Sequence, residues 1–136
     1  MIKVSGERSL DILLKFMKPK LVAGEYVFST FAKEEVEKLT FTPLMTYVED
    51  EGVTVVLERQ LAESFGITSG PTWSLITLTV HSDLEAVGFI ARMSTELANA
   101  GISVNVVSAY YHDHLFVPHD KAEKAMEVLK RLSEAA

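Results

Sequence analysis

Apolar and polar positions alternate most regularly in the second half of the chain, where they predict strands and helices in a definite order. Residues 73–81, WSLITLTVH, are almost continuously apolar or β-branched, which predicts a strand buried on at least one face. Residues 85–101 predict a helix that ends at Gly101, because glycine is the usual residue just after a helix. The apolar stripe expected on this helix consists of Val87, Ile90, Ala91, Ser94, Leu97 and Ala98.

Two further strands and a helix complete the second half. Residues 102–111 and 114–118 predict a strand pair, with His112 and Asp113 as the turn between them. Asp120 and Glu123 have the spacing of a capping box, which predicts a last helix beginning there. The positions that this helix should bury are Ala122, Ala125, Met126, Leu129 and Leu132. The resulting order, β-α-β-β-α, lacks only the last strand of a ferredoxin-like β-α-β-β-α-β unit.

The first half predicts a short helix and at least two strands. The helix has Ser9 as its N-cap and ends before Pro19. Residues 25–31 and 52–60 predict strands because they are rich in β-branched and aromatic residues. The pattern leaves residues 31–39 open between a helical turn and a loop, and 39–48 open between a strand and an irregular segment. A strand from this half could complete the sheet of the other.

Residues 65–72, FGITSGPT, predict a linker because glycine, serine and proline cluster there. A length of 136 residues suits one ordinary domain or two very small ones. We therefore expect an α+β protein of two similar ferredoxin-like units, 1–66 and 72–136, which pack into one body and could share strands.

Composition narrows the class of protein. Apolar residues make up 48% of the chain and charged residues 24%, which is typical of a globular domain with a core. A net charge of −6 without a basic run argues against nucleic acid as a partner. The absence of cysteine excludes disulfides, thiolate metal sites and cysteine nucleophiles. No signal-peptide pattern and no apolar run of about 20 residues is present, so we expect a cytoplasmic protein without a membrane partner.

The stretch YYHDHLFVPHD, residues 110–120, is rich in histidine and aspartate, so it is a candidate metal site or acid–base site. His112 and His114 would point to the same side of an extended chain, but Asp113 would face away. His119 would lie roughly 16 Å from His114 on an extended strand, too far to share one ion. The chain has no nucleophile elbow, phosphate-binding loop or His-Glu-x-x-His helix. We therefore predict no metal, no cofactor, no catalytic residue and no enzyme activity.

Residues 83–118 resemble the ACT domain, a small amino-acid-sensing module. Three features support the resemblance: Gly-Phe-Ile-Ala-Arg at 88–92, Ala-Gly-Ile-Ser-Val-Asn at 100–105, and an apolar strand leading to an aromatic and polar turn. The likeness is closest to the tandem ACT pairs of aspartate kinases and to the related CASTOR arginine sensors. The first half resembles the divergent N-terminal partner of small two-ACT proteins, mainly at 24–27 and in the pattern of 42–43 followed by 53–56.

The resemblance implies an effector site between two ACT units, at the start of the 85–101 helix and on the strand that follows it. The residues carried over by motif are Asp83, Val87, Gly88, Phe89, Val104, Asn105, Tyr110 and Tyr111. Gly88 would allow close approach, and the first N–H groups of the helix would suit a carboxylate. The alternative is structural: Gly88 serves helix-on-sheet packing, Val87, Phe89 and Val104 belong to the core, and Asn105 caps a loop.

Two functions follow as hypotheses. The first is a small regulatory protein that binds an amino acid or similar effector between its two units or between the subunits of a homodimer, and signals to a partner enzyme or regulator. The second is an ACT-type dimerisation or interaction module that binds no small molecule.

Overall fold

The computed structural model describes residues 6–136, which form two compact units. One unit combines residues 6–23 with residues 74–136, and the other consists of residues 24–73. In the described part of the chain, no helix is long and apolar enough to cross a membrane.

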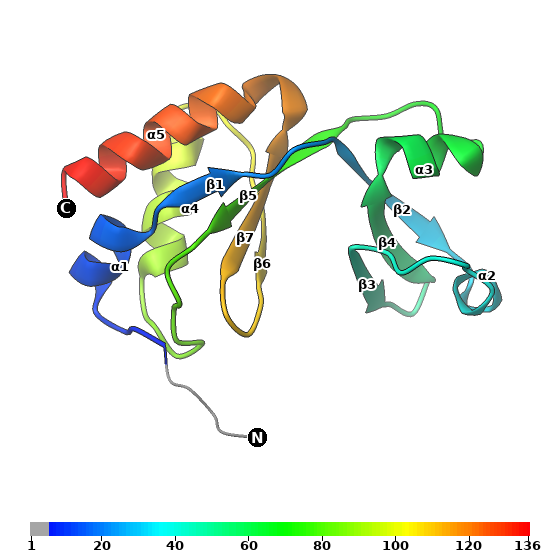
Figure 1. Cartoon of the computed structure of the whole chain (residues 1–136), viewed down its shortest axis with the longest axis horizontal. Coiled ribbons are helices and arrows are strands. Elements are labelled where there is room, and N and C mark those ends of the chain that lie inside the picture. Colours follow the sequence, from blue (N-terminus) through cyan, green and yellow to red (C-terminus); the bar gives the residue numbers. More distant parts are fainter. Residues whose placement is uncertain (1–5) are drawn as a thin grey trace. The chain divides into compact units, whose positions relative to one another are not determined.

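The C-terminal unit contains helices on one face of a sheet (Figure 1). Its elements are α1 (Leu10–Phe16), β1 (Pro19–Leu21), β5 (Trp73–Leu78), α4 (Phe89–Asn99), β6 (Asn105–Ser108), β7 (Asp113–Pro118), η1 (His119–Lys121) and α5 (Ala122–Glu134). The strand order is β1-β5-β7-β6, and β1 pairs antiparallel with β5 so that Leu21 lies opposite Ile76. In the sheet, β1 takes the place of the strand missing from the C-terminal half, although it comes first in the chain, so the unit has the sheet of a β-α-β-β-α-β fold.

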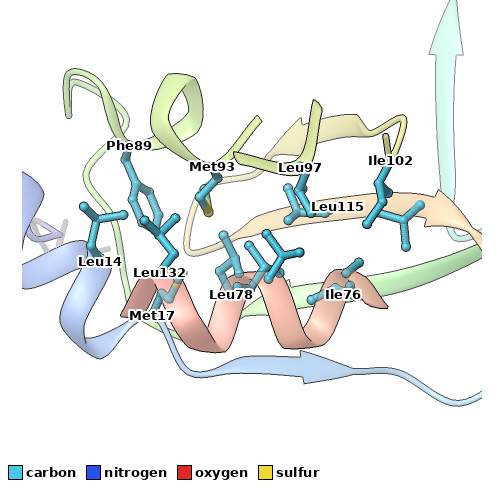
Figure 2. Close-up of a cluster of buried hydrophobic side chains, with 14 of the residues drawn as sticks. Leu14, Met17, Ile76, Leu78, Phe89, Met93, Leu97, Ile102, Leu115 and Leu132 are labelled. Carbon is cyan, nitrogen blue, oxygen red and sulfur yellow. The ribbon is translucent and has the colours of Figure 1, made fainter. Parts of the chain in front are cut away.

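The core of this unit lies between its sheet and its three α-helices. Ile76 and Leu78 from β5 and Leu115 from β7 point toward the helices, as alternate residues of a strand do. Figure 2 shows them converging with Met17, which follows α1, and with side chains from the helices: Leu14, Phe89, Met93, Leu97 and Leu132. Because α1 and β1 contribute to this core and sheet, residues 6–23 belong to the same folding unit as residues 74–136.

Helix α4 ends as expected but buries a different stripe. Gly101 has φ of 74°, and the N–H of Ile102 donates to the Leu97 carbonyl at 2.9 Å, which is the bonding of a Schellman motif. The buried positions are Phe89, Met93 and Leu97, spaced four apart. The predicted stripe was wrong at Val87, Ala91 and Ala98, which are exposed. The helix begins only at Phe89, so Val87 precedes it.

The hairpin between β6 and β7 turns two residues earlier than predicted. The Ala109 N–H donates to the His112 carbonyl at 3.0 Å, which places Tyr110 and Tyr111 at the tip. Asp113 pairs with Ser108 as the first residue of β7 and is buried. The predicted turn at His112 and Asp113 was therefore wrong, because Asp113 continues the inward-facing alternation of β7.

The final helix buries the expected face but begins differently. Strand β7 leads into the 3-10 turn η1, and α5 starts at Ala122 without a side-chain cap. The predicted capping box at Asp120 was therefore wrong. Ala122, Ala125, Leu129 and Leu132 are buried as predicted, together with Val128, while Met126 is half-buried.

The N-terminal unit contains β2 (Tyr26–Phe31), α2 (Lys33–Glu37), β3 (Met45–Val48), β4 (Val53–Glu58) and α3 (Arg59–Ser64). Its strand order is β3-β4-β2, and Tyr26 pairs with Trp73 at the beginning of β5. The two segments that the sequence left open are thus the helix α2 and the strand β3. The strand predicted through residue 60 ends at Glu58, and α3, which was not predicted, begins at Arg59.

Candidate functional site

A pocket of about 110 Å³ lies at the start of α4 in the C-terminal unit. It brings together the loop after β5, the first turn of α4 and the two strands of the β6–β7 hairpin at the end near its turn. Its lining residues are Ser82, Asp83, Leu84, Ala86, Gly88, Phe89, Ile90, Ala91, Ser108 and Asp113. Most of the polar groups of this pocket come from residues that are far apart in the sequence.

The first turn of α4 presents backbone donors to the pocket. The first N–H to bond within the helix is that of Arg92, which donates to the Gly88 carbonyl at 2.9 Å. The N–H groups of Phe89, Ile90 and Ala91 therefore have no intrahelical partner, and no side chain caps this end. The helix dipole adds partial positive charge there, so an anionic group such as a carboxylate is favoured.

Gly88 is required for conformation and not for space. Its φ of 90° lies in the left-handed region, where other residues are strained. A Cβ at this position would meet only the Leu10 side chain, at an ordinary contact distance of 3.7 Å. The structural alternative, close packing of the helix on the sheet, therefore does not account for glycine here.

Asp113 and Ser82 form the buried polar floor of the pocket. Asp113 has 5% of its surface exposed and Ser82 has 7%. The Ser82 hydroxyl donates to Asp113 Oδ2 at 2.9 Å. Neither residue was predicted to belong to the ligand site. The available signal was the alternation Asp113, Leu115, Val117, which places the carboxylate on the core-facing side of the strand.

Asp83 organises the loop between β5 and α4. Its N–H donates to the Glu7 carbonyl at 2.9 Å, and its Oδ1 accepts from the Glu85 N–H at 2.8 Å. Arg8 Nε lies 3.3 Å from Asp83 Oδ2. Gly6 permits this arrangement, since a Cβ there would come within 2.5 Å of the Asp83 nitrogen. The segment from Gly6 to Arg8 thus holds the pocket loop in place.

The residues predicted for the site are distributed over three places. Asp83, Gly88 and Phe89 line the pocket, although the Phe89 side chain is part of the core. Val87, 84% exposed, does not line it. Val104 packs against the core, and Asn105 is exposed at the far end of β6, about 10 Å along the strand from Ser108.

Tyr110 and Tyr111 lie at the tip of the hairpin in an aromatic cluster. Their ring centroids are 4.8 Å apart, and Tyr111 lies 5.4 Å from the ring of His81, the residue before Ser82. The cluster is therefore close in sequence to two pocket segments: His81 directly precedes Ser82, and the two tyrosines lie between Ser108 and Asp113. It supplies aromatic surface for an apolar group outside the pocket.

His114 makes a structural contact within the sheet. His114 Nδ1 is 3.0 Å from the Thr77 hydroxyl, on the sheet face opposite the core. Burial lowers the pKa of His114, and the nearby His112 lowers it further, while Asp113 opposes both effects. Among residues 6–136, no three histidine, aspartate or glutamate side chains gather in a group suited to a metal ion.

A larger hollow of about 520 Å³ lies between α1 and the end of α5. The residues around it include Ile12, Phe16 and Lys15, which are exposed. It has no buried polar side chain to orient a ligand, whereas the smaller pocket has two, Ser82 and Asp113. The smaller pocket is therefore the candidate site.

Comparison with known proteins gives two matches to ACT-domain family models. Residues 5–71 match one ACT-domain model and residues 69–131 match another. A crystal structure of VC0802 from Vibrio cholerae, a protein of unknown function and possible transport protein, shares 49% identity over 88% of this chain and 92% of its own, with a TM-score of 0.80. Protein Atu0741 from Agrobacterium tumefaciens shares the fold at 18% identity, covering 85% of this chain and 87% of its own, with a TM-score of 0.64. No curated protein matches.

Proposed function

The chain belongs to the ACT-domain family as a tandem pair of ACT domains, and we propose that it is a regulatory protein that binds an amino acid or a similar small effector. ACT domains are regulatory small-molecule-binding modules and not catalytic ones. The single observation that supports the proposal is the pocket at the start of α4, where three backbone N–H groups without intrahelical partners meet a buried carboxylate. The likeness to aspartate kinase and CASTOR pairs stays a prediction.

The effector's carboxylate would lie against the first turn of α4. Gly88 sets the backbone conformation that opens this turn, and Asp83 fixes the preceding loop through Arg8 and Glu7. Tyr110 and Tyr111 would contact the effector's side chain. Val87 lies outside the pocket and is exposed, so it would be available for a contact with the second subunit of a homodimer.

A homodimer is part of this proposal. Strand β3 pairs only with β4 within the described sheet, so its other edge is open. On this strand Tyr47 and Val48 are 67% and 75% exposed. An open edge with exposed apolar side chains suits pairing with a second strand. The ligand would shift the dimerisation equilibrium, or the binding of a partner enzyme, only if its affinity for the associated state differs from its affinity for the free state.

A thermal-shift screen against the twenty amino acids tests the proposal. A ligand that binds only the folded protein stabilises it by about 2.7 kcal/mol at a concentration of 100 times its Kd. We expect at least one amino acid to raise the melting temperature, and calorimetry to confirm one site per chain. If no amino acid stabilises a well-folded sample, the effector-binding role is wrong.

The open β3 edge also favours the second hypothesis, an ACT-type interaction module without a small ligand. The same screen distinguishes the two. An interaction module would form its dimer or bind its partner enzyme in the absence of any amino acid, and none of the twenty would change its melting temperature.

A further inference from the structure

Asp113 is a carboxylate in a place that normally excludes charge. It lies on the core-facing side of β7, on the same side as Leu115 and Val117, which are fully buried. Burying an ionised carboxylate costs several kcal/mol unless hydrogen bonds or an opposite charge compensate. The residues around Asp113 should therefore show what compensates it.

Within residues 6–136 that compensation is incomplete. Oδ2 of Asp113 accepts a hydrogen bond from Ser82, but Oδ1 accepts none and Asp113 forms no ion pair. His114, the adjacent residue, bonds to Thr77 on the opposite face of the sheet. An ionised carboxylate can accept about four hydrogen bonds. Oδ1 is therefore available to a donor that enters the pocket.

The other carboxylate of the pocket is already neutralised. Asp83 has Arg8 at 3.3 Å and accepts from the Glu85 N–H. Arg8 also pairs with Glu85 and forms no ion pair with Asp113 among the described residues. Two aspartates thus line one pocket, one with a cation from the protein and one without.

The pocket therefore offers sites for two opposite charges. The N–H groups at the start of α4 favour an anion, and Asp113 favours a cation with N–H donors. A cavity of 150 Å³ holds the six carbons of benzene, so a pocket of about 110 Å³ holds roughly five heavy atoms. The zwitterionic head group of an α-amino acid, which is its ammonium nitrogen, Cα and carboxylate, has this size and this pair of charges.

We propose that Asp113 recognises the ammonium group of the effector, with Ser82 as the residue that positions it. The pocket then holds only the head group, and the effector's side chain leaves through the mouth. This inference rests on the proposed function and adds its selectivity: α-amino acids bind, while the corresponding hydroxy acids are rejected. The hydroxy acid keeps the carboxylate but leaves the buried charge of Asp113 without a cation.

Titrations of the full-length protein with glycine and with glycolate, followed by amide NMR, test this proposal. These probes differ only in the ammonium or hydroxyl group, and NMR detects millimolar binding. We expect glycine to bind at least about tenfold more tightly than glycolate, since a charge-assisted hydrogen bond to a buried carboxylate is lost. Equal affinities for the two probes in the unaltered protein would overturn the proposal without any mutant.

The variant Asp113→Asn keeps the shape and removes the charge. We expect it to lose at least about tenfold in glycine affinity while glycolate binding changes by less than about threefold, so that selectivity disappears. Asp120→Asn, at an exposed aspartate in η1, is the matched control and should retain full selectivity. If amino acids bind but selectivity survives in Asp113→Asn, only this inference fails. If neither glycine nor any other amino acid binds, the proposed function fails with it.

Discussion

At the scale of single residues, Gly88 sets the backbone conformation at the start of α4, where the effector's carboxylate is proposed to bind. Its positive φ precedes the three residues whose N–H groups have no intrahelical partner, and these residues line the pocket. The space around it would accept a methyl group, so the conformation alone excludes other residues. A substitution at Gly88 can therefore change effector binding without disturbing the packing around it.

The variant Gly88→Ala should therefore weaken effector binding more than it weakens the fold. Strain at a left-handed position costs about 1–2 kcal/mol. Gly66→Ala is the matched control, because Gly66 has φ of 80° and no atom within 4 Å. Urea unfolding should show similar losses for both, while calorimetry shows weaker binding only for Gly88→Ala. Equal affinity in the two variants would contradict the role of this helix start.

His114 should make stability depend on pH. Its pKa in the folded protein is lowered, mainly by burial, so the unfolded chain binds more protons below pH 6.5. Its contribution is complete above that value and is lost as the pH falls through the lowered pKa. In His114→Gln, unfolding curves measured from pH 7 to pH 5 should lose less stability than those of the unaltered protein. If the variant and the unaltered protein lose the same stability between pH 7 and pH 5, the predicted contribution of His114 is wrong.

The residues of the candidate site could be predicted from sequence only in part. The Gly-Phe-Ile-Ala-Arg motif located Gly88 and the start of α4, because backbone conformation at glycine is a local property. The place of Asp113 in the pocket was not predicted because two local signals compete at this position. His-Asp is typical of a turn, whereas the alternation with Leu115 and Val117 places Asp113 in a strand. The pairing of Ser82 with Asp113 is tertiary and has no sequence pattern.

At the scale of elements, the β1 strand determines which segments fold together. A strand from the first half was expected to complete this sheet, but β1 has only three residues and no alternating pattern, so its position could not be predicted. It forms because β5 offers an open edge, and before it Leu13 and Leu14 of α1 and the following Met17 are buried. Helix α5 and the end of α4, by contrast, follow from helical periodicity and from Gly101, and were predicted. Local patterns thus indicated the long elements, while long-range pairing determined the short ones.

The permuted chain 74–136 followed by 6–23 should fold by itself, whereas residues 74–136 alone should not. The permutant restores β1 and the apolar residues of α1 to the core. A Gly/Ser linker of about twelve residues has a mean reach of roughly 20 Å. Circular dichroism and cooperative urea unfolding measure the difference. A stable, cooperative fold for residues 74–136 alone would contradict the role given to β1 and α1.

At the scale of the whole molecule, the chain is a tandem pair of ACT domains in which the candidate effector pocket lies within the C-terminal unit. The N-terminal unit presents an open β3 edge with exposed Tyr47 and Val48, which suits a role in assembly. We infer a division of labour between the units: one binds the effector and the other contributes to the dimer or to a partner contact.

The most direct test of the central claim is to map, by amide NMR, where the best amino acid from the thermal-shift screen binds on the isotope-labelled protein. The account predicts that the largest chemical-shift changes occur at the amides of Phe89, Ile90 and Ala91. Changes concentrated around Ile12 and Lys15, which line the larger hollow between α1 and α5, would contradict it.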